Sequence, residues 1–148
     1  MLKIGDKAPN VLGIDQNGVE VNLESYKGKK VVLYFYPKDN TPGCTDQACD
    51  LRDNIGAIKN AGYEIIGVSV DDEKSHRKFI EKFSLPFPLI ADVDQKLVQA
   101  FGVWVEKSMY GKSYMGTARV TFVIDEDGTI INVIDKVKTK EHTAQILG

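Results

Sequence analysis

The 148-residue sequence is poor in cysteine, in charge of one sign and in long hydrophobic runs. Two cysteines are too few for a disulfide-stapled secreted scaffold or a zinc site of four thiolates, but they leave open a mixed site with His76 and His142. The 19 basic and 21 acidic residues give a net charge of −2, without the positive excess that binds a phosphate backbone. We therefore do not expect a nucleic acid as the main partner.

The lack of a long apolar run bears on the compartment. The longest run, residues 31–36, is far too short to cross a bilayer, and residues 1–7 turn polar at once, unlike a signal peptide. We expect a cytoplasmic protein without a membrane partner, in a compartment where thiols stay reduced. No repeat, low-complexity tract or linker-like stretch is present, so residues 1–148 are predicted to form a single domain.

Apolar patterns predict several β-strands. Residues 11–23 alternate between apolar and polar side chains around a turn signal, which predicts an N-terminal β-hairpin. The continuous β-branched and aromatic run at 31–36 is typical of a strand buried on both faces. Further strands are expected at residues 63–70, 88–91, 120–124 and 129–134. The last two flank a turn signal and are expected to pair as an antiparallel hairpin.

Helical spacing begins after the first long strand. An apolar stripe over residues 44–58 predicts one helix that starts at Pro42 and stops at residues 61–62. Asp71 or Asp72 is expected to cap a second helix. Its apolar face would consist of Phe79, Ile80 and Phe83.

The remaining stretches complete the predicted fold. A short helix is expected at 95–101, and a last helix, capped by Thr139, is expected to run to residue 147. Residues 102–118 show neither helical nor strand periodicity and are expected to form a functional loop. This order predicts an α/β protein with a central mixed β-sheet flanked by helices and with the N-terminal β-hairpin. A right-handed crossover would bring Cys44 to the sheet edge where α/β proteins usually carry their chemistry.

Cys44 stands at a predicted helix start. Thr41 is a good N-cap and Pro42 suits the first helical position, so Cys44 occupies the third. The unpaired N–H groups and the helix dipole stabilise an anion there, and such a setting can lower a thiol pKa from about 8.5 to roughly 3.5–7.5. The position predicts a nucleophile. The alternative is an inert cysteine at the head of the apolar stripe.

Cys49 lies five residues further along the same helix. In an intact helix the two Cα atoms would be about 8.6 Å apart, beyond the limit of about 7 Å for a disulfide. Either the cysteines are unrelated or the helix unwinds when they join. This spacing disfavours a zinc site, and it differs from the Cys-x-x-Cys pattern of simple dithiol exchange.

Few other charged side chains are candidates for the site. Arg77 is expected to be solvated, and Arg52 lies two turns from Cys44. Arg119 stands at the start of a predicted strand, where sheet formation does not require an arginine. Taken alone, it suggests a charged side chain at the rim of the site. His76 and His142 stand among charged residues and are expected at the surface.

Residues 34–45 contain the pattern Pro-x3-Thr-x2-Cys, formed by Pro37, Thr41 and Cys44. With this segment the sequence resembles the peroxiredoxins, in particular the bacterioferritin-comigratory or peroxiredoxin Q subgroup, over essentially its whole length. Further stretches that carry the resemblance are residues 48–53, 101–104 and 119–125. Together they are far more specific than the cysteine spacing alone.

The resemblance implies a thioredoxin-like fold and a thiol peroxidase. By position, Cys44 resembles the peroxidatic cysteine and Cys49 the resolving cysteine of those members that carry one in this helix. Thr41 would orient the peroxide and Pro37 would shield the thiol. Arg119 would polarise both thiolate and peroxide, which replaces its interpretation as a rim charge.

The resemblance also implies the reaction partners. A hydroperoxide would be the substrate, and thioredoxin or a similar dithiol would reduce a Cys44–Cys49 disulfide, without a metal or organic cofactor. The mixed surface charge favours a monomer. Apolar side chains within residues 102–118 suggest that bulky organic peroxides are tolerated: Trp104, Met109, Tyr110, Tyr114 and Met115. Alternatives of other classes are a peroxide-sensing redox switch, a thiol-disulfide reductase and a zinc-binding domain.

Overall fold

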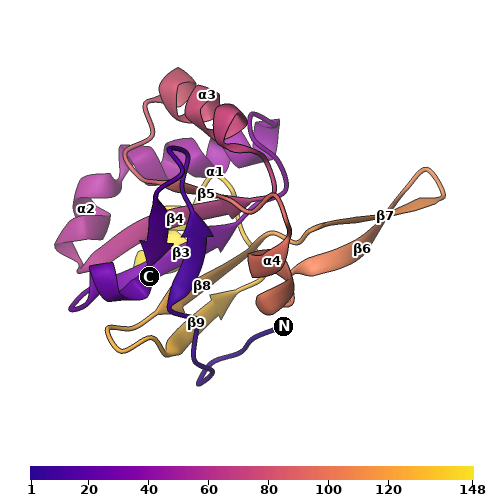
Figure 1. Cartoon of the computed structure of the whole chain (residues 1–148). Coiled ribbons are helices and arrows are strands. Elements are labelled where there is room, and N and C mark those ends of the chain that lie inside the picture. Colours follow the sequence, from indigo (N-terminus) through magenta and orange to yellow (C-terminus); the bar gives the residue numbers. More distant parts are fainter.

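The computed structural model describes residues 1–148 and is built around a five-stranded β-sheet in the order β5-β4-β3-β8-β9 (Figure 1). The strands are β3 (Lys30–Phe35), β4 (Tyr63–Ser69), β5 (Leu89–Ala91), β8 (Val120–Ile124) and β9 (Ile130–Ile134). β3, β4 and β5 run parallel, whereas β8 is antiparallel to both β3 and β9. The predicted mixed sheet and its C-terminal hairpin are confirmed.

Helices and a small hairpin cover the two faces of this sheet. The helices are α1 (Pro42–Asp53), α2 (Ile55–Asn60), α3 (Glu73–Phe83), α4 (Lys96–Ala100), α5 (His142–Leu147) and the 3-10 turn η1 (Leu23–Tyr26). Buried side chains of α1, α2, α3 and α5 form one core cluster. The predicted N-terminal hairpin, β1 (Val11–Ile14) and β2 (Glu20–Asn22), shares the other with α4. None of the helices is both long and apolar enough to span a membrane.

Strand β3 separates the two cores because successive side chains of a strand point to opposite faces. Leu33 and Phe35 pack toward α4 and the N-terminal hairpin, whereas Tyr34 packs toward α1. Cys44 is buried in the same cluster as Tyr34. The apolar run that predicted a strand buried on both faces therefore also decides which face meets the cysteine helix.

The predicted single helix after β3 is interrupted at Asn54. Its side-chain amide donates to the carbonyl oxygen of Asp50 at 2.8 Å, and α1 ends there before α2 begins. Asparagine favours such breaks because its side chain competes with the helical backbone for hydrogen bonds. Leu51 and Ile58 remain fully buried on either side of the break, so the apolar stripe was a correct guide to the packing but not to the helix boundary.

Helix α5 docks on α1 through Asp50. The Thr143 amide donates to the Asp50 carboxylate at 2.7 Å, and the Thr143 hydroxyl donates to the Asp50 carbonyl at 3.3 Å. The predicted cap was wrong: Glu141, not Thr139, occupies the N-cap of α5. For α3, Asp72 is the cap, and its carboxylate accepts from the Ser75 amide at 2.8 Å.

The functional loop expected at residues 102–118 is instead a β-hairpin that extends away from the rest of the chain (Figure 1). Its strands, β6 (Trp104–Met109) and β7 (Lys112–Thr117), pair only with each other. Tyr110 and Gly111 form the turn, both with positive φ, as a type I′ hairpin turn requires. The prediction failed because a ribbon that is exposed on both sides needs no apolar alternation.

The surface positions expected for the two histidines are also wrong. His76 and His142 are both fully buried. His142 donates from Nδ1 to the Gln145 side-chain oxygen at 2.9 Å, and its Nε2 accepts from the Thr121 hydroxyl at 2.8 Å. Their charged neighbours in the sequence hid the fact that each imidazole faces the core.

The buried His142 predicts an acid-sensitive fold. Burial lowers the pKa of His142 below its usual value, partly opposed by the Gln145 hydrogen bond. At low pH the unfolded chain therefore binds more protons than the folded chain. The contribution of neutral His142 to the free energy of unfolding is fully present above about pH 6.5. It is lost on acidification, by at most about 1.4 kcal/mol per pH unit. Urea unfolding between pH 5 and 8 should show a shallower pH dependence for His142→Gln. Equal slopes in the two proteins would contradict this role.

Candidate active site

The first turn of α1 presents its backbone N–H groups at Cys44. Thr41 occupies the N-cap with extended backbone, Pro42 is the first helical residue, and the 2% exposed Cys44 is the third, as predicted. The Thr41 hydroxyl does not cap the helix: it donates to the Lys38 carbonyl at 2.9 Å. The amide groups of the first turn are thus left without a side-chain cap, and with the helix dipole they favour negative charge on the Cys44 sulfur.

Arg119 supplies a full positive charge at the same sulfur. Its Nη2 donates to Cys44 Sγ at 3.3 Å, and its Nη1 donates to the side-chain oxygen of Gln47 at 2.8 Å. Arg119 immediately precedes β8, next to the central strand β3. Gly43 leaves room for this arrangement, since a Cβ there would lie 3.2 Å from Nη2. An opposite charge at this distance favours the thiolate.

Gln47 is a site residue that the sequence analysis missed. It is fully buried, and while its oxygen holds Arg119, its side-chain amide nitrogen has no hydrogen-bond partner. It follows Cys44 by three positions, so helical spacing places both side chains on one face of α1. This spacing, which places a glutamine beside Cys44 on the predicted helix, was the available signal.

Tyr34 is the second residue that sequence reasoning missed. Its hydroxyl is buried without a hydrogen-bond partner, and its ring stacks on Tyr36 with centroids 5.4 Å apart. Burial first, then the negative charges of Cys44 and Asp39, raises the pKa of Tyr34 well above its usual value. The phenol therefore stays protonated, and its O–H group remains available as a hydrogen-bond donor on the face of the sheet that α1 covers.

Cys49 is half-buried on α1, and both cysteines are free. Because α1 is continuous from Pro42 to Asp53, the two thiols cannot bond without a change in the helix. Pro37 is the second residue after the end of β3, in the segment that leads to Thr41. The structure thus brings Thr41, Cys44 and Arg119 to one place and leaves Cys49 apart from them.

The other two arginines lie outside this group. Arg52 Nη1 donates to the carbonyl oxygen of Phe83 at 2.8 Å, and its Nη2 pairs with Asp53 at 2.9 Å. Arg77 is exposed, as expected, and donates to the Gln16 carbonyl at 2.8 Å. Neither guanidinium is directed at a cysteine.

The β6–β7 hairpin contributes a cation rather than an apolar lining. Lys107 Nζ donates to the Thr117 carbonyl at 2.6 Å. Burial first, then the nearby Arg119 charge, lowers the pKa of Lys107, while negative charge on Cys44 acts in the opposite direction. The apolar side chains expected to shape a peroxide pocket are mostly in solvent, and Tyr110 at the hairpin tip is 97% exposed. Three more are exposed: Met109, Tyr114 and Met115.

The potential metal ligands do not gather at the cysteines. His76 and His142 each use both ring nitrogens in hydrogen bonds with other groups. One group of potential ligands converges elsewhere, Asp39, Asp71 and His76, and it contains no thiol. The mixed cysteine–histidine site left open by the composition is not assembled in this structure.

Comparisons with known proteins agree with the fold and with the sequence motif. The model of the AhpC/TSA family matches residues 4–133. Peroxiredoxin Bcp of Bacillus subtilis (strain 168) is 49% identical over 146 residues, covering 99% of this chain and 93% of the relative. Peroxiredoxin Bcp of Escherichia coli (strain K12) is 47% identical over 146 residues, covering 99% and 94%.

The solved structures include the bacterioferritin comigratory protein of Xanthomonas campestris, studied for its alkyl peroxide reduction activity. It superimposes with a TM-score of 0.84 at 39% identity, covering 90% of this chain and 85% of that one. Fold and comparisons define a thioredoxin-like thiol peroxidase, an oxidoreductase. Within that class the chain belongs to the AhpC/TSA family and is a peroxiredoxin of the Bcp, or peroxiredoxin Q, group, which confirms the resemblance seen in the sequence.

Proposed function

We propose that this peroxiredoxin reduces hydrogen peroxide and organic hydroperoxides in the cytoplasm, as a monomer and with Cys44 as the nucleophile. The observation that carries the proposal is the 3.3 Å contact of Arg119 with Cys44 Sγ at the start of α1. A guanidinium and unpaired helix N–H groups beside a buried thiol both stabilise its thiolate form. The alkyl peroxide reduction activity of the Xanthomonas campestris relative supports organic hydroperoxides as substrates.

The chemistry begins with attack of the Cys44 thiolate on the terminal oxygen of the hydroperoxide, in line with the O–O bond. The S–O bond forms as the O–O bond breaks, the departing alkoxide or hydroxide takes up a proton, and Cys44 becomes a sulfenic acid. The Thr41 hydroxyl donates a hydrogen bond to the Lys38 carbonyl oxygen, so its lone pairs are free to accept a hydrogen bond from the peroxide hydroxyl. Arg119 and the helix N–H groups stabilise the charge that shifts from sulfur to oxygen.

The second step regenerates the thiol through Cys49. Local unwinding of α1 brings the Cys49 thiol to the sulfenic acid, and a disulfide forms with release of water. Thioredoxin or a similar dithiol then reduces this disulfide by exchange, and no metal or organic cofactor takes part. Pro37 shields the sulfur before this step.

Replacing Cys49 separates the two half-reactions. Cys49→Ser is expected to consume one peroxide per enzyme at the wild-type rate and to accumulate the Cys44 sulfenic acid. It should lose more than about 90% of the steady-state rate supported by thioredoxin, because no disulfide forms for exchange. Stopped-flow peroxide consumption, followed by trapping of the sulfenic acid, measures both. An undiminished thioredoxin-driven rate would remove Cys49 from the cycle.

The same assay tests the proposed activity as a whole. Wild-type protein with thioredoxin and its reductase should turn over both hydrogen peroxide and an alkyl hydroperoxide. Reduction of insulin disulfides at a higher rate than peroxide would identify a thiol-disulfide reductase instead. Oxidation by peroxide without turnover would identify a redox switch.

A further inference from the structure

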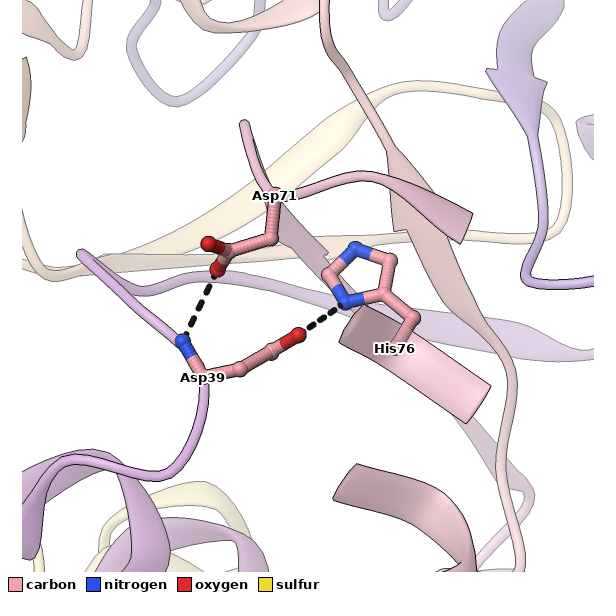
Figure 2. A group of neighbouring side chains, drawn as sticks. All are labelled: Asp39, Asp71 and His76. Carbon is pink, nitrogen blue, oxygen red and sulfur yellow. Dashed lines mark hydrogen bonds and ion pairs between the residues drawn. The ribbon is translucent and has the colours of Figure 1, made fainter. Parts of the chain in front are cut away.

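A buried polar cluster outside the reaction centre joins the segment before α1 to α3 (Figure 2). We call it the Asp39 cluster. Its members are Tyr36, Asp39, Ser69, Asp71, Ser75 and His76. His76 is fully buried and Asp39 nearly so, yet the proposed reaction uses neither of them.

Asp39 is the centre of the cluster. One carboxylate oxygen accepts from the Tyr36 hydroxyl at 2.6 Å, and the other accepts from the Ser75 hydroxyl at 2.8 Å. The second oxygen also lies 2.6 Å from His76 Nδ1, and the Asp39 amide donates to the Asp71 carboxylate at 2.8 Å (Figure 2). Asp39 is therefore held through both its side chain and its backbone.

The hydrogen-bond partners show which atoms of the cluster must carry a proton. His76 Nε2 lies 2.8 Å from the Ile90 carbonyl oxygen, which can only accept, so Nε2 carries a proton. Nδ1 lies 2.6 Å from an Asp39 oxygen, and the same carboxyl group accepts from two hydroxyl groups, so one proton lies between the imidazole and Asp39. Burial first, then the Asp39 charge, raises the pKa of Tyr36 well above its usual value and keeps its phenol a donor.

The same contacts argue against a metal ion at this place. Both ring nitrogens of His76 are engaged, and one Asp71 oxygen accepts from the Asp39 amide and from the Ser69 hydroxyl at 2.7 Å. A cation would have to break these hydrogen bonds within a buried space. Because leaving a buried polar group without a hydrogen bond costs free energy, these satisfied groups favour one fixed position of the segment that carries Asp39.

The segment that it holds leads directly to the reaction centre. Asp39 is followed by Asn40, which has left-handed backbone with φ of 59°, and then by Thr41, whose hydroxyl donates back to Lys38. The position of the Thr41 oxygen, and with it the entry into α1, is therefore fixed by a short chain segment tied down at Asp39. Displacement of Asp39 would be transmitted to Thr41 through a single intervening residue, Asn40.

We propose that Asp39 and His76 are positioning residues for peroxide reduction, which act by holding the Thr41 hydroxyl where it can orient the peroxide. This inference rests on the proposed function. It assigns to His76 an effect on the rate of Cys44 oxidation through Thr41, although the imidazole makes no contact with Thr41 or Cys44 among its hydrogen bonds.

A double-mutant cycle tests the route through Thr41. The second-order rate constant of the reduced enzyme with hydrogen peroxide is measured for wild type, His76→Leu, Thr41→Val and the double variant. His76→Leu should lower this constant by about tenfold or more, since a small misplacement of a positioning group has large effects. In the Thr41→Val background the same change should cost less than about threefold. An equal loss in both backgrounds, or no loss, would overturn the proposal.

Two controls keep the result interpretable. His142→Leu removes the other fully buried histidine, which has no hydrogen bond to the Asp39 cluster, and should leave the rate constant within about twofold at a temperature where both variants are folded. If His76→Leu does not fold, Tyr36→Phe removes one donor to Asp39, with an expected loss of about threefold that vanishes without the Thr41 hydroxyl. A wild-type protein that does not react with peroxide would contradict the proposed function itself. A failed mutant cycle with an active wild-type protein would contradict only the positioning role of Asp39 and His76.

Discussion

Cys44→Ser is expected to lower peroxide reduction by more than about 10³-fold, because a serine hydroxyl at neutral pH supplies no equivalent of the thiolate nucleophile. Serine is nearly the size of cysteine, so the buried position should tolerate it without a change of fold. Arg119 and the first turn of α1 would remain in place, but they would have no anion to stabilise. Stopped-flow measurement of hydrogen peroxide consumption by the reduced protein gives the result directly.

Cys49→Ser is the matched control for this experiment. Both variants lose one thiol of the same helix and both lose the capacity for an internal disulfide. Only the loss of Cys44 should abolish the first turnover. A first turnover that survives in Cys44→Ser and disappears in Cys49→Ser would exchange the roles of the two cysteines.

Arg119→Met is expected to lower kcat/KM for hydrogen peroxide by about 10²–10³-fold, the effect of removing a donor that stabilises transition-state charge. The methionine side chain keeps much of the apolar length but offers no donor to Cys44 Sγ or to the oxygen of Gln47. Gln47 would then be buried without any partner for its amide. The fraction of Cys44 that alkylates rapidly at neutral pH should fall as well, because the thiolate loses its paired charge.

Arg52→Met serves as the control for charge and side-chain type. Arg52 stands on the same helix but donates to the Phe83 carbonyl, so its loss should change kcat/KM by less than about threefold. Arg119→Lys restores the positive charge as a compact ammonium group without the planar fork of the guanidinium, and it should recover part of the rate. Equal kcat/KM values for Arg119→Met and wild type would exclude Arg119 from the reaction.

Much of the fold was predictable because its elements bury regular apolar patterns. The aromatic run of β3 and the turn of the β8–β9 hairpin agree with the observed elements, and the apolar stripe marks the face that α1 and α2 bury. The helix start at Thr41 and Pro42 was also predictable, since the preferences for those two positions are local. These local signals were enough to place Cys44 at the edge of the sheet.

What could not be predicted depends on contacts between distant segments. Arg119 meets Cys44 across 75 positions of sequence, and only the family resemblance pointed to it, because composition and strand pattern alone do not distinguish it from a rim charge. His76 did carry a signal, because it precedes Phe79 by three positions and Phe83 by seven and so continues the apolar face of α3. Its partner Asp39 lies on another segment, and this pairing is visible only in three dimensions.

The docking of α1 also has an electrochemical consequence. Hydrogen bonds from Thr143 to Asp50 and from Arg52 to Phe83 tie the intact helix to its neighbours, and the proposed Cys44–Cys49 bond can form only when this helix gives way. These contacts thus stabilise the dithiol over the disulfide, and every 1.4 kcal/mol of that preference raises the reduction potential of the couple by about 30 mV. The packing of one helix thereby determines how readily an outside dithiol returns the enzyme to its starting state.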